Sequence, residues 1–247
     1  MFSKVFYAPN VDANPYKLIQ RVDSVNKVDP QILNTISHEL RTPIAIISSN
    51  IQLLKDSGSQ ADLCFRNECL ELCAESVESL KSFFDSIQLI TMAAKNQIHP
   101  SFSVFRVKQI THNLFVVLAK QNLNFKRITL DWDLMIPKIT SDLYFLQLII
   151  ISICSNAIKF SRGEINLTIQ TNQNHLVLCI QDRGIGIPED EFDLIFSPFY
   201  RARNISRIPG AGLGLAVVSA LTNSMEGEIF LSSKMGLGTS IIIRFNL

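Results

Sequence analysis

Residues 28–57 read VDPQILNTISHELRTPIAIISSNIQLLKDS, and their apolar positions decide the first half of the fold. These positions recur every three or four residues, as one face of an α-helix requires. The stripe consists of Val28, Ile32, Ile36, Leu40, Ile44, Ile47, Ile51 and Leu54. After the breaker at 56–59 a second stripe repeats close to every seven residues, at Leu63, Leu70, Cys73, Val77, Leu80, Phe84 and Ile87. Together the stripes predict a helical hairpin.

A single hairpin leaves apolar surface open, so we expect a second copy of the chain to cover it in a dimeric four-helix bundle. A monomeric hairpin packed on the rest of the chain is the alternative. The seven-residue repeats stop around Asn96–Pro100. The segment at 1–26 has scattered polar residues and two prolines, and we interpret it as a linker or the remnant of an upstream region.

Beyond Pro100 the chain mixes short alternating segments with longer apolar ones. This pattern lacks regular βαβ alternation, so it predicts an α+β two-layer sandwich with a mixed sheet and helices on one face. The chain is therefore predicted to be multidomain, with an all-α helical hairpin followed by this α+β unit. Strands are expected at 102–107, 128–134, 165–170, 176–181, 228–232 and 239–245, and helices at 108–120, 142–160 and 213–225.

Composition excludes several classes of protein. The 247 residues include 23 Lys plus Arg against 22 Asp plus Glu, so there is no global field to attract nucleic acid or an anionic membrane. The longest apolar stretch, Leu146–Cys154, is about half the ~18 residues of a spanning helix, and we expect no membrane segment. Five cysteines without a secretory pattern indicate free thiols in a reducing compartment. A metal shared by Cys69 and Cys73 is a minor alternative.

One polar residue lies on the wrong side of the first predicted helix for a core role. At about 100° per residue, His38 points roughly 180° away from the centre of the apolar stripe, toward solvent. Glu39 is adjacent and Thr42 lies one turn further along. Pro43 removes a helix donor at a cost of about 3 kcal/mol, which suggests that this turn must deform.

The heptapeptide Ser37-His38-Glu39-Leu40-Arg41-Thr42-Pro43 resembles the phosphoacceptor motif of the sensor histidine kinases of two-component signalling. The resemblance extends from about residue 27 to the C-terminus. It implies that His38 accepts the phosphoryl group, that Glu39 is a general base or orients the imidazole, and that Thr42 orients water for dephosphorylation of a partner. It further implies a dimerisation and histidine phosphotransfer domain at 27–96 and a catalytic ATP-binding domain at 97–247.

Residues 155–160, Ser-Asn-Ala-Ile-Lys-Phe, end the long predicted helix and are similar to the family's asparagine motif. The resemblance implies that Asn156 ligates Mg²⁺, that Lys159 binds the phosphates and that Phe160 packs on the adenine. One turn earlier the family usually carries another asparagine, and this chain has Ser152. The effect of that hydroxyl on Mg²⁺ binding is open at this stage.

Residues 182–188, Asp-Arg-Gly-Ile-Gly-Ile-Pro, follow a predicted strand. The resemblance implies that Asp182 accepts a hydrogen bond from the adenine amino group, while Gly184 and Gly186 permit close approach of the ligand. Residues 196–201 are similar to the family's phenylalanine motif beside a flexible lid, with Arg201 as the cation on the terminal phosphates. Arg203 and Arg207 are expected to be solvated, and the alternative is that either of them joins Arg201 on the phosphates.

Residues 210–215, Gly-Ala-Gly-Leu-Gly-Leu, open a predicted helix. Free amides and the positive end of the helix dipole would there face the phosphates. A dinucleotide-binding fold is excluded because no βαβ unit surrounds the glycines. This motif completes the expected nucleotide site with Gly210, Gly212, Leu213 and Gly214. The later Gly236–Thr239 segment is expected to be a structural hairpin turn.

The resemblance implies ATP-dependent phosphorylation of His38 with ATP and Mg²⁺ as cofactors, transfer to an aspartate of a response-regulator receiver domain, and phosphatase activity toward that partner. We expect a homodimer that lies in the cytoplasm, either by itself or as the cytoplasmic part of a membrane-bound sensor. Two alternatives are a nucleotide-binding scaffold with little catalysis, motivated by Ser152, and an ATPase of the gyrase and heat-shock chaperone superfamily. The signal, the particular regulator and the choice between transfer within or between subunits are open.

Overall fold

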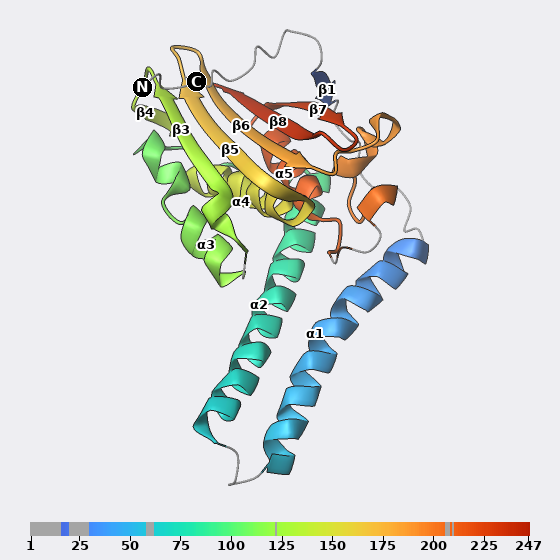
Figure 1. The fold of residues 1–247 in the computed structure, drawn as a ribbon. Coiled ribbons are helices and arrows are strands. Elements are labelled where there is room, and N and C mark those ends of the chain that lie inside the picture. Colours follow the sequence, from blue (N-terminus) through green and yellow to red (C-terminus); the bar gives the residue numbers. More distant parts are fainter. Residues whose placement is uncertain (1–15, 20–29, 58–61, 122, 206–207, 209) are drawn as a thin grey trace.

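The computed structural model describes residues 16–19, 30–57, 62–121, 123–205, 208 and 210–247 (Figure 1). Two long helices form a stem, and the rest of the described chain forms a lobe at one end of it. The helices are α1 (Pro30–Ser57), α2 (Leu63–Ala94), α3 (Leu114–Lys120), α4 (Leu143–Phe160) and α5 (Gly214–Ser224). The strands are β1 (Lys17–Ile19), β2 (Ser103–Arg106), β3 (Ile128–Leu134), β4 (Lys138–Ser141), β5 (Ser161–Thr171), β6 (His175–Gly184), β7 (Glu228–Lys234) and β8 (Gly238–Asn246).

The stem is the predicted hairpin of α1 and α2. The N-terminus of α2 is capped by Asp62, whose carboxylate accepts a hydrogen bond from the Phe65 amide at 2.7 Å. Pro43 lies inside α1 and is buried, so the helix continues through a position without a backbone donor. Of the breaker expected at 56–59, residues 56 and 57 still belong to α1, and residues 58 and 59 lie outside the described residues.

The face of α2 that meets α1 differs from the predicted stripe. The buried residues of α2 are Cys69 and Ser76, whereas four members of the predicted stripe are exposed. Those four are Leu63, Leu70, Val77 and Phe84. On α1 the stripe members Ile44 and Ile51 are also exposed. A seven-residue repeat marks two neighbouring faces of a helix, and in this chain only one of them packs inside the hairpin.

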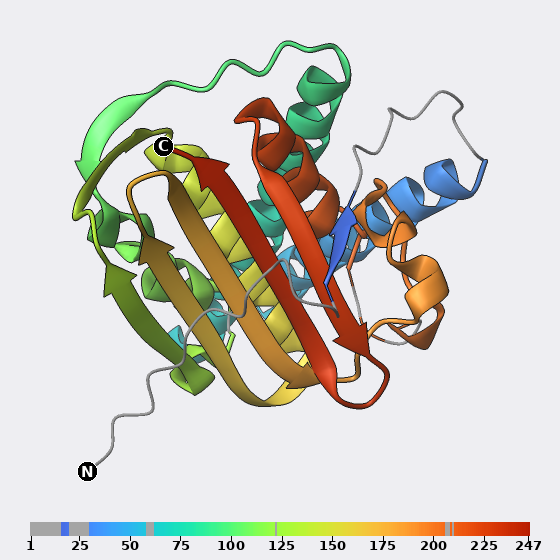
Figure 2. The ribbon, with the colours of Figure 1, turned by 90° about the horizontal axis from the view of Figure 1, so that it is seen from above.

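The lobe is an α+β sandwich, as predicted. Its six-stranded sheet has the order β1-β7-β8-β6-β5-β3, in which only the β3–β5 pair is parallel. Helices α3, α4 and α5 cover one face of this sheet (Figure 2). A second, two-stranded sheet pairs β2 with β4. The C-terminal turns of α2 pack against the lobe core, through Leu89, Ile90, Met92 and Ala93.

Helix α4 forms the centre of the lobe core. Its residues Leu146, Ile149, Ile150 and Cys154 have no exposed surface, and burial raises the pKa of the Cys154 thiol to about 12. Among the described helices, α4 is the one long and apolar enough to span a membrane, yet half of it is buried inside the lobe. Its apolar length is therefore explained by packing between the sheet and the surrounding helices.

Three local predictions need correction. The expected helix at 108–120 is a 3₁₀ turn at Val107–Thr111 followed by α3, because the backbone does not continue helically through the residues between them. Strand β4, four residues long, was not predicted. Strand β1 was not predicted either, and it lies inside the segment interpreted as a linker.

Candidate nucleotide and phosphoacceptor site

The C-terminal end of α4 carries Asn156, Lys159 and Phe160. This helix end is fixed by Arg127, whose guanidinium donates hydrogen bonds of 2.9 Å to the carbonyls of Ile158, Ser161 and Gly163. Charge-assisted bonds of this kind satisfy carbonyls that the end of a helix leaves without partners. Sequence reasoning did not identify Arg127, because nothing in the local pattern links it to a helix end more than thirty residues later.

The end of β6 lies directly beside the end of α4. Asp182 accepts a hydrogen bond from the Gly184 amide at 2.7 Å. Burial raises the pKa of Asp182, and backbone hydrogen bonds from Gly184 and Thr239 oppose that shift. A methyl group at Gly184 would lie 2.5 Å from the carbonyl oxygen of Phe160, so only glycine permits this approach.

The start of α5 completes the arrangement. Leu213 occupies the N-cap position of α5 and makes no capping hydrogen bond through its side chain. A methyl group at Gly214 would lie 3.5 Å from the amide nitrogen of Asn156, so Asn156 borders the N-terminus of this helix. Uncapped amides and the helix dipole favour an anion there. The structure thus brings together three of the predicted motifs that are distant in sequence.

The segment at 196–201 packs against the same glycines. The Phe199 amide donates to the Gly212 carbonyl at 3.1 Å, and Gly212 has a φ of +71° with the Tyr200 carbonyl close by. Arg201 does not extend into solvent. Its guanidinium donates to the carbonyls of Ile205, at 3.0 Å, and Ile208, so it holds the lid segment together, and its predicted contact with phosphates stays a prediction.

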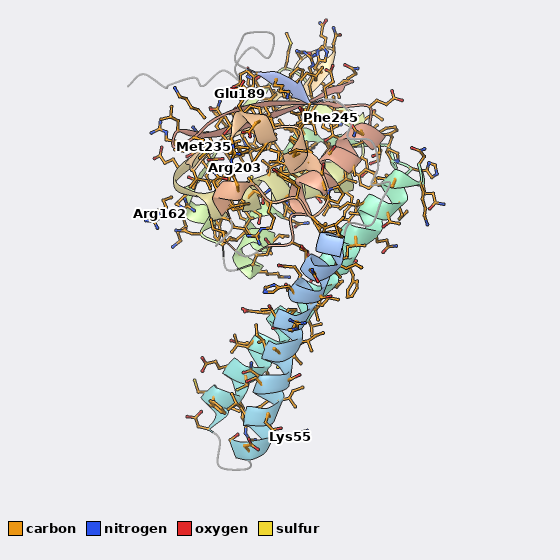
Figure 3. All side chains as sticks on the ribbon, turned by 90° about the vertical axis from the view of Figure 1, so that its right-hand side faces the viewer. Lys55, Arg162, Glu189, Arg203, Met235 and Phe245 are labelled. Atoms are coloured by element: carbon orange, nitrogen blue, oxygen red, sulfur yellow. The ribbon has the colours of Figure 1, made fainter. Side chains whose placement is uncertain are left out.

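Arg203 is exposed as expected, with a side chain 65% accessible to solvent, but it also makes ion pairs that were not predicted. Its guanidinium lies 2.7 Å from a carboxylate oxygen of Asp190 and 3.3 Å from one of Glu191, whose side chain is only 6% exposed. Figure 3 labels Arg203 on the outer side of the lobe, on the same side as Met235. Nearby, the side-chain amide of Asn204 donates a hydrogen bond of 2.8 Å to the Gly186 carbonyl. This bond links the segment that follows Arg201 to the loop that follows β6. Arg207 lies outside the described residues.

His38 lies on the stem as its position in the helix predicted. Its side chain is 76% exposed, and its Nδ1 lies 4.0 Å from a carboxylate oxygen of Glu39. Thr42 donates from its hydroxyl to the His38 carbonyl at 3.4 Å. Helix α1 therefore presents the imidazole to solvent on the half of the stem near the lobe, whereas Lys55 lies at the far end (Figure 3).

The stem and the α4 end are also coupled electrostatically. Burial lowers the pKa of the Lys159 ammonium, and the carboxylate of Glu39 opposes that shift. The charge of Glu39 is therefore felt at Lys159, although the two residues lie in the stem and the lobe of one chain. Because Glu39 follows His38 directly, the turn that displays the imidazole lies near the predicted nucleotide site.

The donors present suit Mg²⁺ carried by a nucleotide rather than a metal held by the protein alone. Among the described residues no group of three or more His, Cys, Asp or Glu side chains could hold a metal ion. A hard cation that keeps its waters and phosphate ligands needs few protein donors, and the Asn156 amide oxygen beside the start of α5 meets that need. Cys73 approaches the Ile47 carbonyl at 3.9 Å within the hairpin, which favours packing over the shared metal site.

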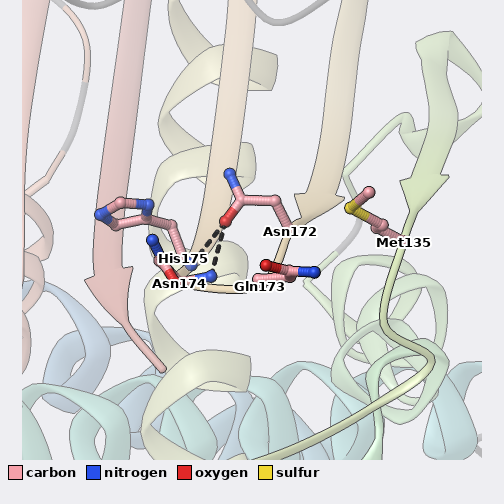
Figure 4. A pocket seen from close by; sticks show the side chains of 5 residues that line it. All are labelled: Met135, Asn172, Gln173, Asn174 and His175. Carbon is pink, nitrogen blue, oxygen red and sulfur yellow. Dashed lines mark hydrogen bonds between the residues drawn. The ribbon is translucent and has the colours of Figure 1, made fainter.

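A separate hollow lies at the β5–β6 turn and is lined by Met135, Asn172, Gln173, Asn174 and His175 (Figure 4). The Asn172 side chain accepts hydrogen bonds from the backbone amides of Asn174 and His175 at 2.9 and 2.8 Å. The hollow is thus a by-product of the turn. It lies at the end of these strands opposite to Asp182 and Gly184.

Comparison with known proteins agrees with this geometry. Residues 31–93 match the His Kinase A (phospho-acceptor) domain family, and residues 141–247 match the Histidine kinase-, DNA gyrase B-, and HSP90-like ATPase family. The two matches cover the stem and most of the lobe in the order found in one class of signalling proteins. The chain belongs to the sensor histidine kinase family.

Curated relatives include the sensor protein kinase WalK of Staphylococcus aureus, 30% identical over 86% of this chain and 52% of the relative. Sensor histidine kinase YkoH of Bacillus subtilis is 28% identical over 87% of this chain and 47% of the relative. The chain thus spans about half the length of these relatives.

Solved structures share the fold. The Acinetobacter baumannii histidine kinase AdeS aligns with a TM-score of 0.62 at 24% identity, over 85% of this chain and 97% of that one. Full-length ShkA in complex with AMPPNP aligns with a TM-score of 0.61 at 24% identity, over 88% and 46% of the two chains. Histidine kinase ThkA in complex with the response regulator TrrA aligns with a TM-score of 0.58 at 17% identity, over 88% and 61%.

Proposed function

We propose that this chain is an ATP-dependent protein-histidine kinase that phosphorylates its own His38 and passes the phosphoryl group to an aspartate of a response-regulator receiver domain. One observation carries the proposal. The end of α4, the end of β6 and the start of α5 converge on a lobe that adjoins an exposed histidine of the stem, and this convergence supports a site for phosphates and adenine.

In the proposed reaction an imidazole nitrogen of His38 attacks the γ-phosphorus of ATP in line, the bond to the β-phosphate oxygen breaks, and ADP leaves. Because Glu39 lies on the Nδ1 side of the ring, Nε2 is the nitrogen free to attack. Glu39 orients the imidazole and accepts its proton.

In this proposal the lobe binds both the adenine and the phosphates of the nucleotide. The carboxylate of Asp182 accepts a hydrogen bond from the adenine amino group, and Phe160 packs on the ring, with Gly184 and Gly186 allowing close approach. The amides of Gly212, Leu213 and Gly214 and the ammonium of Lys159 receive the phosphates. Gly210 has open space around it and leaves room for the phosphates in this proposal. Arg201 reaches the phosphates only after releasing the carbonyls that it now contacts.

Asn156 is the proposed ligand for Mg²⁺, which neutralises phosphate charge when bound. Ser152 lies one turn earlier on α4 and is half-buried. A hydroxyl there can bind a water of the hydrated ion but is too short to replace a second amide ligand. We therefore propose a single direct protein ligand to the metal.

The proposed partners follow from the same parts. The exposed apolar side chains of the stem support a homodimer that forms a four-helix bundle. The fold shared with the ThkA–TrrA complex supports a response regulator as the acceptor. Thr42, one turn after His38, is proposed to orient water during dephosphorylation of that regulator. We propose a cytoplasmic location, consistent with ATP as the substrate.

Incubation with γ-labelled ATP and Mg²⁺ tests the proposal. We expect an acid-labile, base-stable label on the wild-type chain and on His112→Gln, a control at a second exposed histidine, and no label on His38→Gln. Binding of a nonhydrolysable analogue without labelling would favour the scaffold alternative. Release of inorganic phosphate without a labelled protein would favour an ATPase of the gyrase and chaperone type.

A further inference from the structure

Strand β1 precedes the stem in the sequence yet belongs to the sheet of the lobe. It pairs antiparallel with β7 through Lys17–Leu231, Leu18–Phe230 and Ile19–Ile229, and Figure 2 shows it at the edge of the sheet beside β7. We propose that β1 is a strap that ties the lobe to the start of its own α1 and so keeps the nucleotide site beside His38 of the same chain. This inference rests on the proposed kinase function.

The strap is anchored on both faces of the sheet. Ile19 is only 8% exposed and joins the main core on the helix side. Tyr16, just before β1, packs on the opposite face against a small cluster. That cluster consists of Cys179, Phe230 and Ile242. The Tyr16 hydroxyl lies 3.2 Å from the Ser240 hydroxyl, and burial raises the pKa of Tyr16. A three-residue strand with anchors on both faces is a specific contact rather than a loose edge.

The strap also contacts the base of the lid. The Lys17 ammonium lies 2.6 Å from a carboxylate oxygen of Asp193. Asp193 stands between the 3₁₀ turns Glu189–Glu191 and Leu194–Phe196, and the second of these leads into the segment that contains Arg201. Both charged side chains are about half exposed, so the pair fixes register more than it adds stability.

The length of chain between strap and stem limits the separation of the two parts. Residues 20–29 join Ile19 to the start of α1 at Pro30. Ten residues reach at most about 33–36 Å. The lobe is also attached to the end of α2 through residues 95–102. A body attached at two points explores less space than a body attached at one, which raises the effective concentration of the lobe near α1.

The restrained arrangement places the nucleotide site near the phosphoacceptor of its own chain. Glu39 is only 24% exposed in its side chain, against 76% for His38 next to it. The charge of Glu39 acts on Lys159 in the same chain. The strap therefore favours phosphorylation within one chain, and loss of the strap allows the lobe to move away from α1.

The first test breaks the anchor. Ile19→Asp places a charge in the core, whereas the control Leu18→Ala changes a half-exposed side chain of the same strand. We expect Ile19→Asp to accelerate amide hydrogen exchange in β7 and to lower the initial rate of His38 phosphorylation at saturating ATP at least threefold. Affinity for a nonhydrolysable ATP analogue and transfer from phosphorylated His38 to a receiver domain stay unchanged. Leu18→Ala leaves all four measurements unchanged.

A second variant leaves the lobe unchanged and lengthens the segment that joins β1 to α1. Insertion of ten Gly and Ser residues between residues 24 and 25 keeps every contact of β1. Because effective concentration falls with about the −3/2 power of tether length, we expect a rate about threefold lower with unchanged exchange in β7. The strap proposal would be overturned if Ile19→Asp left amide hydrogen exchange in β7 unaltered. It would also be overturned if both variants phosphorylated His38 at an unaltered or higher rate.

A mixture of two variants tests the same-chain claim. Chains with His38→Gln supply an intact nucleotide site, and chains with Asn156→Ala supply the acceptor. With the two chains in equal amounts and re-paired at random, we expect less than a tenth of the wild-type label, and incorporation near a quarter, which transfer within mixed dimers would give, would overturn the claim. If the wild-type chain itself takes no label, the proposed function fails, whereas hydrogen exchange still decides whether β1 is docked.

Discussion

The stem and the lobe solve the problem of burial in different ways. The lobe encloses its own core, in which residues such as Ile150, Leu178 and Val218 have no exposed surface. The stem buries little within itself, and large apolar side chains such as Leu70 and Phe84 stay more than half exposed. A part that closes its own core can move as a unit, whereas a hairpin with an open apolar face needs another surface to cover it.

The division matches the proposed chemistry. The residues proposed to bind ATP all lie on the self-contained lobe, and the acceptor His38 lies on the part that we expect to be completed by a second copy. Phosphoryl transfer then depends on how the lobe is positioned against the stem rather than on a single preformed pocket.

Truncation of a side chain in the lobe core should have the largest effect, which is a loss of stability. Ile150→Ala in α4 removes a fully buried side chain, and we expect it to lower the free energy of unfolding by about 2–5 kcal/mol in urea denaturation. The same loss of side-chain size on the stem, Leu70→Ala at a 57% exposed position, should leave the unfolding of the lobe unchanged. Equal losses would refute the contrast between a closed and an open core.

A charge on the open face of the stem should separate the two copies. We expect Phe84→Asp to raise the dimer dissociation constant at least about tenfold, because it buries an unpaired carboxylate in the expected interface. Ser82→Asp adds the same charge at another exposed position of α2 and should leave association unchanged. Sedimentation across a concentration series measures both. If Phe84→Asp associates like the wild-type chain, the monomeric hairpin is the correct interpretation.

Thr42 separates two activities on the stem. Its hydroxyl donates a hydrogen bond of 3.4 Å to the His38 carbonyl within its own exposed helix turn, so Thr42→Ala should not disturb α1. We expect autophosphorylation of His38 to stay at the wild-type rate, while dephosphorylation of the receiver domain falls about tenfold, within the usual range for loss of a positioned catalytic group. Thr42→Ser should restore the phosphatase. Parallel loss of both activities would show that Thr42 supports the helix rather than the water.

The smallest effect concerns the charge pair between stem and lobe. Burial holds the pKa of Lys159 below its ordinary value of 10.5. Glu39→Gln removes the charge that opposes this shift, so the pKa should fall further. Since only the protonated ammonium attracts phosphate, affinity for a nonhydrolysable ATP analogue should begin to fall at a lower pH in this variant.

The contribution of Lys159 to stability changes with pH in the opposite direction. Because the unfolded chain binds more protons between the lowered pKa and 10.5, the contribution of Lys159 to stability increases as pH rises through that window. Glu78→Gln on the exposed side of α2 serves as the control for both profiles. Superimposable profiles for the Glu39 and Glu78 variants would place Glu39 away from Lys159.

Sequence reasoning succeeded where the signal is local. The alternation at 128–134 gave β3 with its correct bounds, and the apolar run predicted as a helix at 142–160 gave α4 to within one residue. The outward position of His38 also followed from helix periodicity alone. In each case the residues that determine the element are its own neighbours.

Sequence reasoning failed where an element or side chain has its partner far away in the sequence. Strand β1 is three residues long and is ordered by β7, more than two hundred residues later. Arg127 and Arg203 find their carbonyl and carboxylate partners through the tertiary fold. In α2 the repeat could not tell which of two adjacent faces would meet α1, so Ser76 was missed as a buried position. Such contacts have no periodicity to detect.

The central claim is that the stem supplies the acceptor and the lobe supplies the nucleotide. Mass spectrometry of the chain after incubation with ATP and Mg²⁺, with peptides handled at alkaline pH, tests it most directly. We expect one added phosphate, located on the imidazole of His38. A phosphate on any other residue, or ATP consumed while the chain gains no mass, would contradict it.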